Sequence, residues 1–297
     1  MSAFNGFVTF TIEFNRFIPP ILFVCGVIGN LLSLLAFSGG ILRHNSCATY
    51  FFGLAITHIN NLVFGLLVNN LGDVYGINIL TATIGFCRFR FYVLHISLVL
   101  SSWFIVLASI DRYCISSANV NRRQFSSSKN ARILVGVSIL ICLILYVHVL
   151  VFFTIQQTPV GPQCNAQPGT YAVFYGFFFL ITYSLTPPIL MIIIGFATFH
   201  KIRRIYRQIN PSREENQPQT TTNNVNRLRK KDRQFIKMLL IQLISCVIFT
   251  LPIAIQKLYS TFTQNIPKSS ERLFIENFFT QFVRTLTHVN STLSFYL

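Results

Sequence analysis

The stretch ILVGVSILICLILYVHVLVFFTI, residues 133–155, contains no Lys, Arg, Asp or Glu. About 20 consecutive apolar residues are enough for a helix to cross the hydrocarbon core of a bilayer. A helix is the expected element, because an open sheet edge in lipid would leave backbone polar groups unpaired. This stretch therefore predicts a membrane-spanning helix.

Six more apolar runs of similar length flank this stretch, and the composition agrees with a membrane protein. Of the 297 residues 52% are hydrophobic and only 11% are charged, whereas roughly a quarter are charged in soluble domains. We expect an all-α membrane protein, one bundle of seven transmembrane helices in a single domain. The spans are predicted at residues 17–39, 47–71, 85–114, 132–155, 171–200, 233–259 and 273–297. Residues 210–226, rich in Gln, Asn and Thr, are expected to form a flexible third intracellular loop.

The distribution of basic residues predicts the orientation of the bundle. With the N-terminus outside, the inner loops hold most of the 24 Lys and Arg residues, as the positive-inside rule requires. Lys257, near the end of the sixth span, counts with the fewer outer ones. The formal net charge of +16 is then explained by contact with anionic inner-leaflet lipid, and we expect no nucleic-acid partner.

Enzyme and transporter functions have little support in the sequence. It contains no metal-ligand pair such as His-Glu-x-x-His, no paired intramembrane carboxylates and no Gly-rich phosphate loop. Coupled transporters usually carry several ionisable groups within their spans, and spans one, four, five and six carry few or none. We expect a protein that is not an enzyme and takes no cofactor or metal. A membrane transporter remains a less favoured alternative.

The third predicted span carries charged residues at one end and a cysteine at the other. Asp111, Arg112 and Tyr113 lie at the inner end, and Cys87 lies about 36 Å away along a helix. Cys164 lies in the outer loop between the fourth and fifth spans. Two cysteines on the oxidising side, on neighbouring segments, can form a disulfide.

Over essentially its whole length the chain resembles the rhodopsin-like (class A) G-protein-coupled receptors. The matching positions are Gly29-Asn30, Leu54-Ala55, Cys87, Asp111-Arg112-Tyr113, Pro187 or Pro188, Pro252 and Asn290-Ser291. The Pro187–Pro188 pair and the Asn290–Tyr296 stretch further resemble invertebrate neuropeptide receptors of the FMRFamide-receptor-like kind. The resemblance implies a plasma-membrane receptor that binds an extracellular ligand, activates a heterotrimeric G protein and has a Cys87–Cys164 disulfide.

The resemblance also implies an inner switch. The family's arginine, here Arg112, pairs in the resting state with its neighbour, Asp111, and with an acid at the inner end of the sixth helix. Asp232 stands where that acid would fall, and activation would break the pair in a shift between two packings. The alternative is that Asp232 is a solvated charge among its basic neighbours.

Three residues depart from the family pattern. His58 replaces an aspartate in span two, Thr250 replaces a tryptophan in span six, and Phe295 replaces a proline in span seven. Without the aspartate we predict no sodium site. A histidine inside a membrane is a functional-site hypothesis, and the alternative is a neutral imidazole hydrogen-bonded to Asn61 or Ser294. A decoy receptor that couples poorly is the alternative function.

The outer half of the bundle limits the class of ligand. Leu94 stands where amine receptors of the family have an aspartate, and His288 stands where opsins have a lysine, so neither a biogenic amine nor retinal is expected. Arg90 and Arg284 suit a carboxylate or a peptide backbone, while Arg88 suits snorkelling to the headgroups. We expect a peptide ligand.

Overall fold

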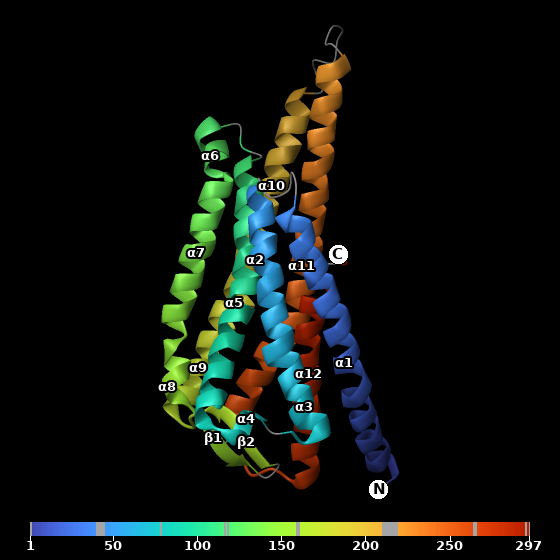
Figure 1. Cartoon of the computed structure of the whole chain (residues 1–297), viewed down its shortest axis with the longest axis vertical. Coiled ribbons are helices and arrows are strands. Elements are labelled where there is room, and N and C mark those ends of the chain that lie inside the picture. Colours follow the sequence, from blue (N-terminus) through green and yellow to red (C-terminus); the bar gives the residue numbers. More distant parts are fainter. Residues whose placement is uncertain are drawn as a thin grey trace.

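The computed structural model describes residues 2–39, 45–77, 79–115, 117, 119–158, 161–209, 219–263, 266–294 and 296. Its helices stand side by side in one elongated bundle (Figure 1). Within these residues six helical stretches are long and apolar enough to cross a bilayer, namely Gly6–Ser38, Ser46–Tyr75, Ile84–Ile115, Ser128–Phe152, Thr170–Thr198 and Leu240–Phe262. The terms outer and inner below denote the two ends of the bundle in the predicted orientation.

The elements follow one another in a simple up-and-down order. They are α1 (Ser2–Ser38), α2 (Ser46–Asn60), the π-helical turn η2 (Asn61–Leu67), α3 (Val68–Tyr75), α4 (Ile79–Ala82), α5 (Ile84–Ile115), α6 (Val120–Phe125), α7 (Ser128–Leu145), α8 (Val147–Phe152), β1 (Phe153–Thr158), β2 (Gly161–Ala166), α9 (Thr170–Phe179), the π-helical turn η3 (Leu180–Leu185), α10 (Thr186–Ile209), α11 (Gln219–Phe262) and α12 (Ser270–Leu293). Helix α12 takes the place of the seventh span and begins with Ser269 as its N-cap, whose Oγ accepts from the Arg272 amide.

Helix α5 is the central helix, and most of its residues from Leu94 to Arg112 are buried. Its outer half packs in an apolar cluster with Tyr146 and Phe179, and its inner half packs with Tyr50 and Leu54 of α2. By contrast, α7 and α10 leave many apolar side chains exposed, as expected for surfaces that face lipid. The bundle therefore has a packed interior and an apolar exterior.

The prolines of the predicted fifth and sixth spans differ in their effect on helix geometry. Pro187 and Pro188 are buried near the start of α10, directly after the π-helical turn η3. Proline has no N–H to donate, so the preceding turn loses backbone hydrogen bonds where it widens. Pro252 lies inside α11, which remains one continuous helix.

A β-hairpin crosses the outer end of the bundle (Figure 1). Strands β1 and β2 pair antiparallel, from Phe153 opposite Ala166 to Thr158 opposite Gly161. The sequence predicted helix up to residue 155, whereas α8 ends at Phe152. The last residues of that apolar run therefore turn into the hairpin instead of extending the span.

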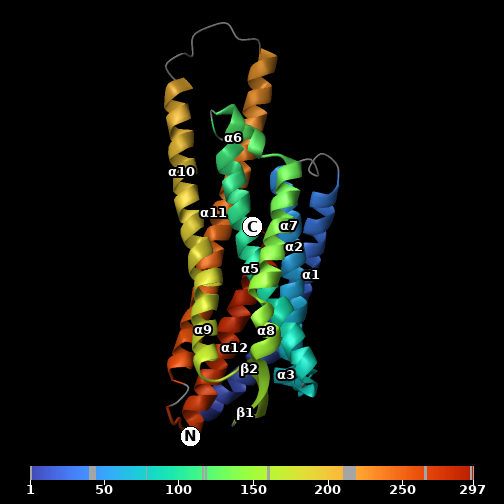
Figure 2. The same cartoon turned by 90° about the vertical axis from the view of Figure 1, so that its left-hand side faces the viewer.

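The segment before the first predicted span and the predicted third intracellular loop both differ from expectation. Residues before 17 were expected outside the first span, but α1 begins at Ser2, and Phe7, Phe10 and Phe14 pack against Phe278 of α12. In the predicted third intracellular loop, residues 219–226 belong to α11 and residues 210–218 lie outside the described part. Figure 2 shows α10 and α11 extending beyond the other helices at the inner end.

Candidate functional site

Asp111 lies at the inner end of α5 and joins three elements. Its Oδ2 accepts a 2.8 Å hydrogen bond from Ser46 Oγ at the start of α2, and its Oδ1 accepts from Ser126 Oγ after α6. The side chain is only 4% exposed. A carboxylate at a helix N-terminus is favoured by the helix dipole, so the start of α2 stabilises the charge of Asp111.

Arg112 is held at the same place by a different residue of α2. Its Nη2 donates to Asn45 Oδ1 at 2.9 Å, and the same atom lies 3.8 Å from Asp111 Oδ2. Asn45 is also the N-cap of α2, accepting from the Cys47 amide. The arginine is 5% exposed, so this buried charge is paired on the α2 side of α5.

The structure gives less detail for Tyr113 and Asp232, the other two residues of the predicted switch. Tyr113 is half-buried on the last turn of α5. Asp232 belongs to α11, but its side chain lies outside the described part of the chain. The ion pair between Arg112 and Asp232 therefore stays a prediction.

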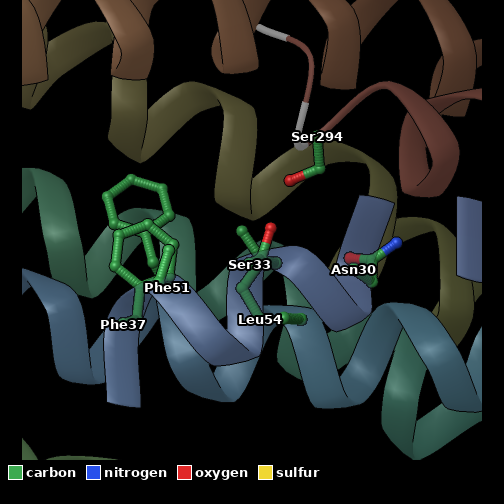
Figure 3. A pocket seen from close by; sticks show the side chains of 8 residues that line it. Asn30, Ser33, Phe37, Phe51, Leu54 and Ser294 are labelled. Carbon is green, nitrogen blue, oxygen red and sulfur yellow. The ribbon is translucent and has the colours of Figure 1, made fainter. Parts of the chain in front are cut away.

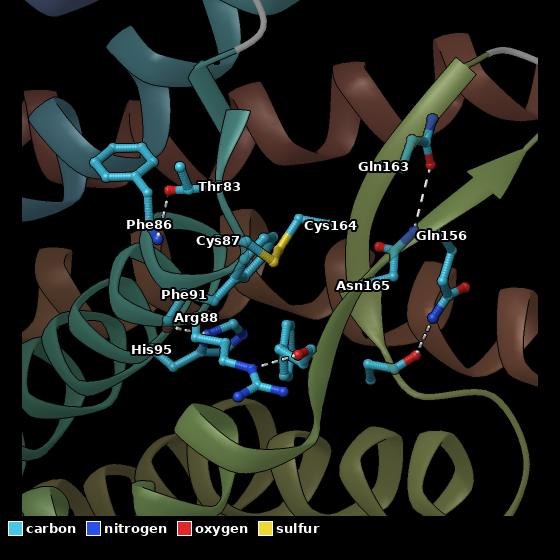
Figure 4. The surroundings of a disulfide bond; sticks show 12 residues. Thr83, Phe86, Cys87, Arg88, Phe91, His95, Gln156, Gln163, Cys164 and Asn165 are labelled. Atoms are coloured by element: carbon cyan, nitrogen blue, oxygen red, sulfur yellow. Dashed lines mark hydrogen bonds between the residues drawn. A yellow bond between two sulfur atoms is a disulfide. The ribbon is translucent and has the colours of Figure 1, made fainter. Parts of the chain in front are cut away.

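The predicted disulfide between Cys87 and Cys164 is confirmed. It joins the start of α5 to β2 with the two Cα atoms 5.8 Å apart (Figure 4). Next to it, Arg88 Nε donates to the Phe153 carbonyl at 2.9 Å, so this side chain binds the start of β1. Both contacts fix the hairpin across the outer end of the bundle.

Arg90 is buried within the bundle at 1% exposed. Its Nε donates to the Phe64 carbonyl at 2.6 Å, and its Nη2 donates to Asn69 Oδ1 at 2.9 Å and to the Gly65 carbonyl at 3.4 Å. Phe64 and Gly65 belong to η2, and a π-helical turn changes the regular pairing of its carbonyls. Arg90 therefore stabilises the irregular turn of the second span.

The other ligand-pocket candidates lie around the same turn. A methyl group placed on Gly65 would lie 2.9 Å from His288 Nε2 and 3.1 Å from a methyl group of Leu94. Arg284, one turn before His288 on α12, forms an ion pair with Asp73 of α3. The structure thus brings Arg90, Leu94 and His288 together, and their contact with a ligand stays a prediction.

Two residues of the family pattern, Asn30 and Asn290, are buried within the bundle. Asn30 Nδ2 donates to the carbonyls of Gly26 at 2.7 Å and Ser291 at 2.9 Å, which joins α1 to α12. Asn290, one residue earlier on α12, is 7% exposed.

The predicted hydrogen bond from His58 to Asn61 or Ser294 is not formed. Neither ring nitrogen has a partner within the described residues, although the side chain is fully buried, and both polar atoms of Asn61 also lack one. Ser294 Oγ instead accepts from Gln242 Nε2 at 3.1 Å. The regular helix α2 ends at Asn60, and Asn61 begins the π-helical turn η2.

A small cavity of about 120 Å³ lies between α1, α2 and the end of α12. Figure 3 shows Asn30, Ser33 and Ser294 around it, with Phe37 and Phe51 at one side. Ligand sites usually measure about 300–1,000 Å³, so this cavity is too small for a peptide. Among the described residues, no three His, Cys, Asp or Glu side chains gather as metal ligands.

Sequence reasoning missed a polar chain at the outer end. Lys257 of α11 donates from Nζ to Tyr175 Oη of α9 at 2.7 Å, and the Tyr175 hydroxyl contacts His95 Nε2 of α5. The sequence did contain a signal for this contact, a lysine within an apolar run five residues after Pro252. A lysine at that position lies inside a span and not in a loop.

Comparison with known proteins agrees with this architecture. A family model described as "7 transmembrane receptor (rhodopsin family)" matches residues 29–294. The chain is also 24% identical over 257 residues to "Neuromedin U receptor homolog nmur-2" of Caenorhabditis elegans, across 82% of this chain. It spans 64% of the length of that relative. This multi-pass membrane protein therefore belongs to the rhodopsin family of seven-transmembrane receptors.

Proposed function

We propose that this protein is a plasma-membrane receptor that binds an extracellular peptide, in the manner of a neuropeptide receptor, and activates a heterotrimeric G protein. The observation that carries the proposal is the arrangement at the inner end of α5. There Arg112 is buried, donates to Asn45 Oδ1 at 2.9 Å and lies 3.8 Å from the Asp111 carboxylate. A charge held this way can exchange partners when helices move.

The peptide class is supported by two independent features. The C. elegans relative is named as a homolog of a neuromedin U receptor. In addition, basic side chains are more numerous than acidic ones around the outer half of the bundle, where Leu94 removes the acid that an amine ligand needs. The FMRFamide-receptor-like subgroup is a finer proposal that rests on the Pro187–Pro188 pair and the Asn290–Tyr296 stretch.

In the proposed switch, Arg112 leaves Asn45 and Asp111 when α11 moves outward. The bundle then opens an inner cleft, and Arg112 binds the G protein in a shift between two packings. Asp232 on α11 would hold Arg112 in the closed packing.

The experiment is a measurement of basal cyclic AMP and calcium in cells that express the chain, beside Arg112→Ala. Arg132→Ala, which removes an exposed arginine near the inner end of α7, is the matched control. Surface labelling of all three proteins corrects for expression. A basal signal that is lost in Arg112→Ala and kept in Arg132→Ala supports coupling, and a basal signal that Arg112→Ala retains contradicts it.

A decoy receptor is the second candidate, and one contact favours it. Thr250, which stands where the family has tryptophan, is 1% exposed and donates to the Cys246 carbonyl of its own helix at 2.7 Å. It therefore lacks the large ring that transmits ligand binding in the family. A protein at the cell surface that stays silent both basally and with neuropeptide extracts would support the decoy.

A further inference from the structure

The corner between α6 and α7, at the inner end of the bundle, carries basic side chains and no acidic ones. Arg122, Arg123, Lys129 and Arg132 are all exposed, and no Asp or Glu occurs in residues 112–213. Arg132 donates from Nε to a carbonyl of its own helix at 3.2 Å. Within the described part of the chain, none of the other three has a carboxylate as its ion-pair partner. The corner therefore presents three cations that no acid of the described chain compensates.

Hydrogen bonds hold α6 and α7 together at this corner. The Phe125 carbonyl at the end of α6 accepts from the Ser127 amide at 2.9 Å and from Asn130 Nδ2 at 3.0 Å. Ser126, between the two helices, donates to Asp111 Oδ1 of α5. Figure 1 shows α6 at the inner end of α7, at the margin of the bundle. The three cations therefore stand on two helical turns that are bonded to each other and to the bundle.

Exposed apolar side chains adjoin these cations on both helices. Val120 and Phe125 are exposed on α6. On α7, Ile133 lies one turn after Lys129 on the same face, Leu140 continues that face, and both are exposed. This helix belongs to a stretch long and apolar enough to cross a bilayer. Basic residues directly beside a lipid-facing surface are typical of contact with anionic lipid, so we favour a lipid over a soluble partner.

The chemistry of the three cations favours a headgroup with several negative charges. A guanidinium group can bind phosphate through two parallel hydrogen bonds, and the corner has two such groups beside one ammonium group. The start of α7 adds the positive end of a helix dipole. A phosphate monoester carries about 1.5 to 2 negative charges at neutral pH. A headgroup with monoester phosphates would therefore compensate all three cations, whereas a single phosphodiester would leave most of their charge uncompensated.

We propose that Arg122, Arg123 and Lys129 bind the headgroup of a polyphosphorylated inositol lipid of the inner leaflet. The acyl chains of this lipid lie along Ile133 and Leu140 of α7, on the surface that already faces the bilayer. Binding at this corner needs neither an extracellular ligand nor a G protein.

Native mass spectrometry of the full-length protein in detergent tests this with three soluble probes. Dioctanoyl phosphatidylinositol bisphosphate carries the monoester phosphates, dioctanoyl phosphatidylinositol lacks them, and inositol trisphosphate has no acyl chains. We expect the bisphosphate lipid to bind with clearly higher affinity than either of the other two. Equal binding of the two lipids would overturn the proposal. Equal binding of inositol trisphosphate would overturn the lipid as the occupant and assign the corner to a free phosphate.

Variants assign the binding to this corner. Arg122→Gln, Arg123→Gln and Lys129→Gln should each weaken binding of the bisphosphate lipid about fivefold, as the loss of one basic residue near an anionic lipid does. The triple variant should lose the preference for the bisphosphate. Arg16→Gln is the matched control, because it removes an exposed arginine at the other end of the bundle and detergent leaves both ends accessible. A triple variant that keeps the preference, or an equal loss in Arg16→Gln, would overturn the proposal.

A second readout uses the parent protein alone and so does not depend on how the variants fold. Phenylglyoxal modifies exposed arginines, and digestion with mass spectrometry locates the modified ones. The bisphosphate lipid should slow modification of Arg122 and Arg123 and leave that of Arg16 unchanged. Modification of the two α6 arginines that the lipid does not slow would also overturn the proposal. Neither readout needs a G protein, so a failure of coupling would contradict the proposed function and leave lipid binding standing.

Discussion

Asp111 and Arg112 are neighbours in the chain, with charged atoms 3.8 Å apart, yet each makes its shorter contacts with other elements. Asp111 accepts from Ser46 at 2.8 Å, and Arg112 donates to Asn45 at 2.9 Å. Both partners lie at the start of α2. The resting position of the arginine therefore depends on α2 as well as on the acidic neighbour.

Replacing the charge of Asp111 should release Arg112. In Asp111→Asn the amide occupies nearly the same volume, but the arginine loses the carboxylate that lies 3.8 Å from its Nη2. If the balance between closed and open packings changes by about 1 kcal/mol, the open population rises roughly fivefold. We expect basal cyclic AMP or calcium, corrected for surface labelling, to rise by that order. Glu13→Gln, which neutralises an exposed acid of α1, should leave the signal unchanged.

A second negative charge beside Asp111 should disturb the inner end. Ser126→Asp would place a carboxylate where a hydroxyl now donates to Asp111 Oδ1, and like charges at this distance repel. We expect a thermal midpoint several degrees below that of the parent protein. Ser127→Asp is the control, because Ser127 is the N-cap of α7 and aspartate is an equally good N-cap. Equal midpoints for the two variants would contradict this account of Asp111.

Removing the disulfide should weaken the outer end. The bond closes a sequence separation of 77 residues, and a cross-link of that length restricts the unfolded chain by about 4 kcal/mol in the loop-entropy model. We expect Cys164→Ser to lose most of its surface labelling. Cys25→Ser, which changes an exposed free thiol, should reach the surface normally. Normal surface delivery of Cys164→Ser would show that the hairpin needs no covalent anchor.

The helical bundle and the inner position of Asp111 could be predicted because each depends on local composition or on position along one helix, whereas the Cys87–Cys164 disulfide was implied by the family resemblance. The helix before residue 17 could not, because Phe7, Phe10 and Phe14 are ordered by contact with Phe278, which is far away in the sequence. Apolar composition alone does not say whether such a segment continues a helix or ends it.

The outer site was predicted in part, for a related reason. Arg90 and Arg284 were expected to face a ligand, but each is bound by acceptors on η2 or α3 that only the fold brings near. The sequence pattern placed Lys257 near the end of a span, among the outer basic residues. Its place inside the bundle was missed because the ends of a span are the least certain feature of a sequence pattern. Its contact with Tyr175 of α9 makes it part of the interior.

The contact between Gly65 and His288 gives the sharpest test of the packing around η2. A methyl group on Gly65 would lie 2.9 Å from His288 Nε2 and closer still to Cε1, so Gly65→Ala should cost about 1–3 kcal/mol through overpacking. Gly136→Ala on α7 is the matched control, because nothing lies within 4 Å of its methyl group. It should be neutral or stabilising, since alanine favours helix over glycine. The double variant Gly65→Ala with His288→Ala should recover most of the loss, because truncating the imidazole removes the ring that the methyl group meets. Thermal midpoints of the parent protein, Gly65→Ala, His288→Ala and the double variant form a double-mutant cycle, and additive losses would show that His288 does not pack on Gly65.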